Sequence, residues 1–71
     1  MDTLNCFLRF RNSDSFMEDI EVSLMTFKQV INDLSCNYQI ISHDYEDYKY
    51  FYFLKGYECY YIGSCSAWLD N

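Results

Sequence analysis

The chain has 71 residues, which is enough for one domain with a net stability of only about 3–5 kcal/mol. Its hydrophobic content is 51%, with six Phe, eight Tyr, one Trp and no proline, and this composition excludes an intrinsically disordered chain. Eleven acidic against five basic residues give a net charge of −6, which argues against direct binding to nucleic acid or to an anionic membrane.

The amino-terminal part of the sequence predicts two strands. Apolar and polar side chains alternate through residues 4–11 and again through residues 19–24, and this period of two is typical of strands with one buried face. A helix over residues 16–24 is the alternative, because apolar side chains also recur there at every fourth position. The β-branched side chains of Ile20 and Val22 favour the strand.

The clearest predicted element is a helix over residues 27–34. Its apolar side chains recur at i, i+3, i+4 and i+7 and form one stripe: Phe27, Val30, Ile31 and Leu34. Thr26 is the predicted N-cap, Gln29 completes a capping box, and Met25 is placed for a hydrophobic staple. Asn37 is expected to end the helix in the left-handed conformation.

Three further strands are expected at residues 38–42, 48–54 and 57–63. The last two are joined at Lys55-Gly56, where glycine supplies the positive φ of a tight turn. The tail, residues 64–71, is expected to fold back onto the sheet. The order of elements is therefore ββαβββ, and the simplest architecture is a single α+β domain with a five-stranded antiparallel sheet and one helix on one face.

The tyrosines of the carboxyl-terminal hairpin point to a binding function. One helix covers only one face of such a sheet, so the other face must be polar or contact another molecule. Tyr48, Tyr50 and Tyr52 share one face of their strand, and Tyr60 lies in the return strand. Tyrosine is enriched in protein interfaces. The alternative is that tyrosine pairs across the strands serve stability alone.

The acidic residues are grouped in two places along the sequence. One group lies in the turn that precedes the tyrosine-rich strand, and the other lies in the first hairpin. Acidic side chains beside tyrosines suit an arginine- and lysine-rich surface on a partner, although they also suit soluble turns. The candidate partner-binding residues are Glu18, Asp19, Glu21, Asp44, Glu46, Asp47, Tyr48, Tyr50, Tyr52 and Tyr60.

No pattern of catalytic, metal-binding or cofactor-binding residues was identified. The four cysteines lack the close pairing of a zinc site, and the single histidine, His43, lies in an acidic turn. The chain begins with Met and shows no signal peptide or transmembrane segment, so we expect a location in the cytoplasm of a host cell and reduced cysteines. In an oxidising environment, Cys59–Cys65 or Cys6–Cys36 would be the candidate disulfides.

In size and charge, the whole chain resembles small acidic phage-encoded inhibitors of bacterial defence, such as anti-CRISPR proteins. The resemblance implies a non-enzymatic protein that inhibits stoichiometrically by blocking a basic, nucleic-acid-binding surface of an effector complex. The alternative from the residues themselves is a homodimeric structural or assembly module that uses the tyrosine-rich face of the sheet.

Overall fold

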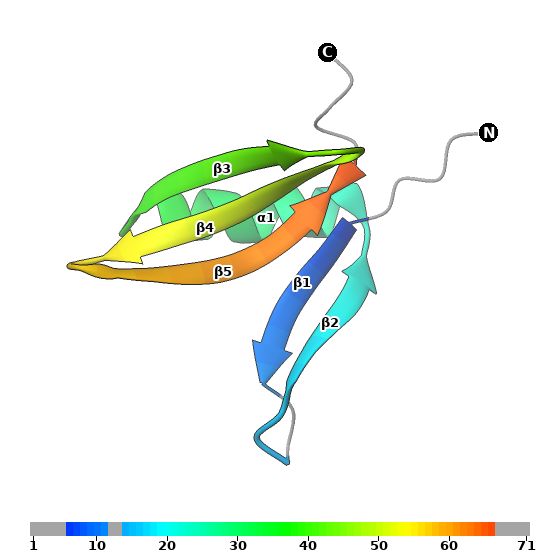
Figure 1. Ribbon diagram of the computed structural model, residues 1–71, viewed down its shortest axis with the longest axis horizontal. Helices are drawn as coiled ribbons and strands as arrows, with labels where there is room; N and C mark the ends of the chain where they lie inside the picture. The colour runs from blue at the N-terminus through cyan, green and yellow to red at the C-terminus, as the bar shows by residue number, and fades with distance from the viewer. Residues whose placement is uncertain (1–5, 12–13, 67–71) are drawn as a thin grey trace.

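The computed structural model describes residues 6–11 and 14–66. In chain order the elements are β1 (Cys6–Arg11), β2 (Met17–Val22), α1 (Leu24–Ser35), β3 (Gln39–Tyr45), β4 (Tyr48–Lys55) and β5 (Glu58–Cys65). The strands form one antiparallel sheet in the order β2-β1-β5-β4-β3, with α1 against one face (Figure 1). The predicted α+β architecture and the order ββαβββ are confirmed. In the described part of the chain, no helix has the length and apolar character needed to cross a membrane.

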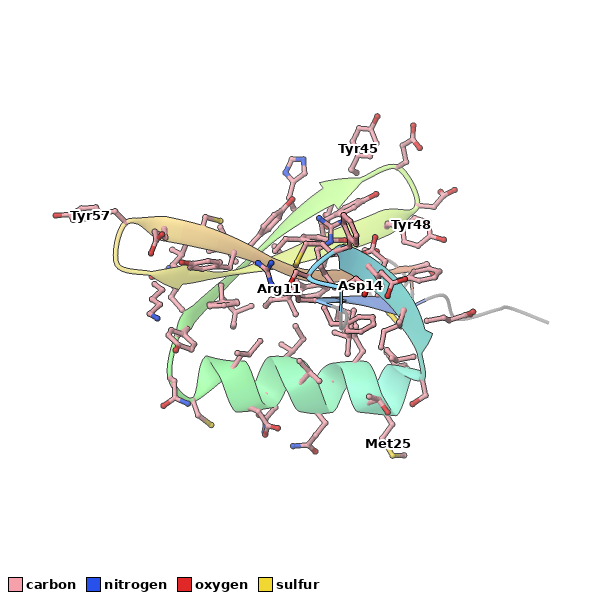
Figure 2. The ribbon with its side chains drawn as sticks, turned by 90° about the horizontal axis from the view of Figure 1, so that it is seen from below. Arg11, Asp14, Met25, Tyr45, Tyr48 and Tyr57 are labelled. Carbon is pink, nitrogen blue, oxygen red and sulfur yellow. A yellow bond between two sulfur atoms is a disulfide. The ribbon has the colours of Figure 1, made fainter. Side chains whose placement is uncertain are left out.

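The helix begins three residues earlier than predicted because Ser23, rather than Thr26, is its N-cap. The Ser23 hydroxyl accepts a hydrogen bond from the backbone N–H of Thr26 at 3.1 Å. Leu24, predicted to end a strand, instead starts the apolar stripe one turn before Phe27. The predicted staple is wrong, because the side chain of Met25 is 82% exposed and points away from the sheet (Figure 2).

The other end of the helix and its surface also differ from the prediction. The backbone N–H groups of residues 36–38 close the helix by donating to carbonyls of its last turn, and Asn37 does not adopt a positive φ. Gln29 donates to Asp33 one turn further along at 2.9 Å rather than completing a capping box. Local hydrogen bonds therefore end this helix without a left-handed residue.

The strands are longer or displaced relative to the prediction. β2 runs over residues 17–22 instead of 19–24, and β3 continues to Tyr45, so that the turn before β4 contains only Glu46 and Asp47. β5 extends to Cys65, two residues into the segment predicted as a tail. Residues 67–71 of that predicted fold-back and the predicted start of the first strand, residues 4–5, lie outside the described residues.

The core lies between α1 and the inner face of the sheet. Five buried side chains form it, and Phe27 of α1 meets Phe51 of β4 edge to face, with ring centroids 5.4 Å apart. The buried residues are Cys6, Phe27, Phe51, Ile62 and Cys65. Because side chains alternate along a strand, Phe51 and Phe53 of β4 face the core, while Tyr50 and Tyr52, which alternate with them, face away from it.

A disulfide between Cys6 and Cys65 joins the first strand to the last. The two residues lie directly opposite each other in the β1–β5 register, and both are fully buried. The expectation of reduced cysteines is therefore wrong for this pair, as are both candidate pairings, because β1 and β5 are distant in sequence but adjacent in the sheet. Cys36 and Cys59 are free thiols at the surface.

The pairing of β1 with β5 is short, and it determines the shape of the sheet. It covers Cys6–Leu8 against Gly63–Cys65, whereas β1 pairs with β2 along its whole length. Beyond Leu8, the β1–β2 hairpin turns away from the direction of β4 and β5, as Figure 1 shows. The β1–β2 hairpin and the β4–β5 hairpin therefore diverge beyond the point where the backbone pairing of β1 with β5 ends.

Gly63 permits this junction. A Cβ atom at position 63 would overlap the carbonyl oxygen of Phe7 and lie 3.0 Å from the ring of Phe27. The other glycine, Gly56, has φ of 62° in the β4–β5 turn, as predicted for a tight hairpin, and a Cβ there would meet no atom within 4 Å.

We predict that Gly63→Ala lowers the free energy of unfolding by about 3 kcal/mol or more, because the added methyl group overlaps a backbone carbonyl at the β1–β5 junction. Gly56→Ala is the matched control and carries only the backbone cost of a positive φ, about 1–2 kcal/mol. Urea unfolding followed by circular dichroism measures both. Equal losses for the two variants would show that the junction tolerates a side chain.

Candidate protein-binding surface

Five tyrosines form a continuous surface on the side of the sheet opposite α1, and we call this surface the tyrosine face. Its members are Tyr45 of β3, Tyr48, Tyr50 and Tyr52 of β4, and Tyr61 of β5. Tyr50 is central, with its ring centroid 6.4 Å from that of Tyr45, 6.5 Å from Tyr48 and 6.1 Å from Tyr61. Tyr52 meets Tyr61 at 5.4 Å. The rings therefore support one another and leave part of their surface open to solvent.

A hollow of about 580 Å³ opens beside the tyrosine face, where the two hairpins diverge. It is wide open to solvent, and both hairpins contribute to its walls. The lining residues are Phe7 and Arg9 of β1, Asp19 of β2, Tyr50 and Tyr52 of β4, and Tyr61 and Ser64 of β5. The hollow follows from the short β1–β5 pairing, because a fully paired β1 would close this space.

Arg9 connects the two walls of the hollow. Its Nε and Nη2 atoms donate to the two carboxylate oxygens of Asp19 at 2.9 and 3.2 Å, a bidentate arrangement. The guanidinium carbon lies 4.6 Å from the ring centroid of Tyr61, within the range of a cation–π contact. The hydrogen bond that Arg9 donates to Asp19 raises the pKa of Arg9 above its usual value, so the side chain stays charged.

The tip of the β3–β4 hairpin places two carboxylates between two tyrosines. Tyr45 and Tyr48 are paired across the hairpin, and Glu46 and Asp47 form the turn between them. Tyr45 is 58% exposed. Figure 2 shows Tyr45 and Tyr48 at the end of the sheet opposite Tyr57, which lies at the tip of the β4–β5 hairpin. At the β3–β4 tip, aromatic and acidic side chains are thus exposed beside one another.

Glu46 adopts a backbone conformation that suits glycine better. Its φ is 54°, close to the 62° of Gly56, which holds the equivalent position in the β4–β5 turn. A side chain with a Cβ atom in this left-handed region costs about 1–2 kcal/mol. The β3–β4 turn therefore keeps an acidic side chain at its tip at some cost in stability.

The structure brings six of the predicted site residues to the tyrosine face, the adjoining hollow or the β3–β4 tip. Tyr48, Tyr50 and Tyr52 belong to the tyrosine face, and Asp19 lines the adjoining hollow. Glu46 and Asp47 lie at the tip that continues this face.

The other predicted site residues lie elsewhere. Tyr60 faces the helix side of the sheet, where it stacks on Phe53 with ring centroids 5.1 Å apart. Asp44 pairs with Lys49 at 3.7 Å. By the alternation of side chains in β2, Glu18 points to the helix side, opposite Phe10. Glu21 points to the same side as the tyrosine face but does not line the hollow.

Sequence reasoning missed Tyr45, Tyr61 and Arg9 as members of this surface. Alternation along the last strand was enough to place Tyr61 on the face of Tyr52 and Tyr60 on the other face. Tyr45 was assigned to a turn, although it continues the alternation of β3. No local signal could have identified Arg9, because its role depends on the approach of β1 to β5.

The pKa values of Tyr60 and Tyr61 are both raised, but for different reasons. Burial raises the pKa of Tyr61 above its ordinary value of 10.0, with a hydrogen bond to Ser64 acting in the opposite direction. A hydrogen bond to Glu58 raises the pKa of Tyr60, with the charge of the same carboxylate adding to it. Both hydroxyls are therefore neutral hydrogen-bonding groups at neutral pH.

Comparisons with known proteins identify no relative. A scan against protein-family models found no match, and searches of the curated proteins and of the solved structures found no significant similarity. Within residues 6–11 and 14–66, no three His, Cys, Asp or Glu side chains gather closely enough to hold a metal ion.

We predict that the protein loses stability as the pH rises above about 10. The raised pKa values of Tyr60 and Tyr61 keep both neutral in the folded state, whereas the unfolded chain ionises at the ordinary pKa of 10.0. The stabilisation that these two neutral hydroxyls contribute is therefore fully present below pH 10. It is lost as the pH rises through the pKa values of Tyr60 and Tyr61 in the folded protein. Urea midpoints between pH 8 and 11 and tyrosinate absorbance in the native protein measure the effect.

Tyr61→Phe should reduce this alkaline loss and remove one late-titrating group from the absorbance curve. Tyr57→Phe is the control, because Tyr57 projects fully into solvent. If both variants change the alkaline titration in the same way, burial of Tyr61 does not perturb its ionisation.

We predict that Glu46→Gly stabilises the protein by about 1 kcal/mol, because glycine adopts a φ of 54° without steric cost. The urea midpoint should rise with an unchanged denaturant slope. Asp47→Gly removes the neighbouring charge at a position without positive φ, and it should not stabilise. A gain from both variants would indicate relief of charge repulsion instead of relief of backbone strain.

Proposed function

We propose that this protein is a non-enzymatic binding protein that uses the tyrosine face and the acidic β3–β4 tip to cover a basic surface of a partner protein. One observation carries the proposal: five tyrosine rings, linked in pairs through Tyr50 and Tyr61, lie on the face that α1 leaves uncovered and continue into a tip with two carboxylates. Large, rigid aromatic side chains with polar tips are the residues that most often dominate binding energy in protein interfaces.

Charge favours a basic partner. The chain has a net charge of −6, and Glu46 and Asp47 stand beside Tyr45 and Tyr48 at the exposed tip. Such an arrangement attracts and orients an arginine- and lysine-rich surface and repels nucleic acid. A partner whose basic surface binds nucleic acid would be blocked stoichiometrically, because the tyrosine face and the nucleic acid would compete for the same side chains.

We predict that Tyr45→Ser combined with Tyr48→Ser weakens capture of basic proteins at least about fivefold, because aromatic contacts at the interface are lost. The bait is the immobilised chain in nuclease-treated host lysate, and the captured proteins are quantified by mass spectrometry. The control is Tyr57→Ser, which removes an exposed tyrosine from the opposite hairpin tip. Glu46→Gln with Asp47→Asn should weaken capture mainly at low salt.

Stoichiometry then tests the inhibitory part of the proposal. Nucleic-acid binding by the captured partner, followed by fluorescence anisotropy, should disappear at about one chain per partner. Loss at far lower ratios would indicate catalysis, and capture that is equal for all variants would remove the tyrosine face from the interface. In sedimentation velocity we expect the 8.6 kDa monomer. A species of twice this mass that the Tyr45 and Tyr48 changes dissociate would instead favour the homodimeric module.

A further inference from the structure

The hollow beside the tyrosine face already holds one guanidinium group, which belongs to the chain itself. Arg9 lies over the ring of Tyr61 at 4.6 Å and donates to both carboxylate oxygens of Asp19. A planar cation that stacks on an aromatic ring and bonds a carboxylate at two points is held in the geometry that proteins use to recognise arginine. The residues of the hollow thus offer a guanidinium one aromatic face and one carboxylate that accepts two hydrogen bonds.

Arg9 is held in this position only weakly. Its side chain is 39% exposed and that of Asp19 is 42% exposed, and ion pairs at such exposure contribute little to stability. The hollow has a volume of about 580 Å³ with Arg9 in place, and the rings of Tyr50 and Tyr52 line this open space. A second side chain can therefore enter without any rearrangement of the backbone.

We infer that the hollow is an arginine-binding site, in which a side chain from the partner protein takes the place of Arg9 between Tyr61 and Asp19. The inference rests on the proposed function and specifies what the tyrosine face recognises. In the free protein, Arg9 shields the carboxylate and the ring, and the partner's arginine binds in competition with it. Release of Arg9 toward solvent frees both groups without leaving a buried charge, because the hollow is open.

The charges around the hollow favour a cation over an anion. Arg9 and Asp19 are the two charged side chains in its lining, and they neutralise each other. The chain as a whole is strongly acidic, so a phosphate or carboxylate ligand would be repelled on approach. Arginine is favoured over lysine because a flat guanidinium can stack on Tyr61 while it bonds both oxygens of Asp19.

The test is a titration of the full chain with the blocked tripeptide acetyl-Gly-Arg-Gly-amide, followed by backbone amide and tyrosine ring NMR signals. We expect saturable shifts at Asp19, Tyr50, Tyr52 and Tyr61. In Arg9→Ala the peptide should bind roughly three- to tenfold more tightly, since it no longer competes with a weak ion pair and a weak cation–π contact. The same peptide with citrulline, which is uncharged, should produce no saturable shifts.

Arg11→Ala is the matched control. Arg11 lies two residues along β1 and bonds the carbonyl of Ser15 at 3.2 Å, outside the hollow, so its removal changes the net charge equally. If Arg11→Ala tightens binding as much as Arg9→Ala, or if citrulline binds equally well, general electrostatics explains the result and the inference is wrong. Adding Asp19→Asn to Arg9→Ala should abolish the gain, with circular dichroism verifying the fold of each variant.

The two proposals can fail separately. The tripeptide reports only on the hollow, so an absence of saturable shifts at its residues would overturn the arginine site and leave capture of a basic partner by the tyrosine face unaffected. Saturable binding of the peptide combined with loss of all partner capture would uphold the arginine site and reject the larger interface.

Discussion

The surface features of this protein depend on one short contact between strands. The β1–β2 hairpin joins the rest of the sheet through residues 6–8 of β1 against residues 63–65 of β5. The contact needs a residue without a side chain at position 63, because the carbonyl of Phe7 fills the space that a Cβ would occupy. Because pairing stops at Leu8, the hairpin diverges and leaves the hollow in which Arg9, Asp19 and Tyr61 meet. A longer pairing would yield a flatter sheet without this site.

The tyrosine face exists because the helix covers only one of the two faces of the sheet. A single 12-residue helix covers one face of five strands, and the phenylalanines of β4 fill the space beneath it. The alternating tyrosines of the same strand are directed to the uncovered face, where their rings pack on one another and remain partly exposed. An aromatic strand can in this way supply both the core and an exposed surface, provided that phenylalanine and tyrosine alternate in register.

The sequence was sufficient for features that depend on neighbouring residues. The apolar stripe predicted the helix, alternation predicted the strands, and Gly56 predicted the tight turn of the last hairpin. Element boundaries shifted where two local patterns overlapped: Leu24 fits both the alternation of β2 and the stripe of α1, and the cap at Ser23 decides for the helix. Features that depend on contacts between distant residues were not predictable, including the β1–β5 pairing, its disulfide and the position of Arg9. The candidate site shows the same division, since Tyr48, Tyr50 and Tyr52 were found by alternation and the hollow was not.

The bond between Cys6 and Cys65 has a consequence for the ensemble of unfolded chains. Its two residues are 59 positions apart, so nearly the entire polypeptide forms one covalent ring. In the chain-entropy description, a ring of this size removes on the order of 4 kcal/mol of conformational freedom from the unfolded state. That amount is comparable with the whole net stability expected for a domain of this length. Because that expected stability is the contribution of the core without a cross-link, the bond adds to it, and reduction of the bond would remove a large share of the protein's net stability.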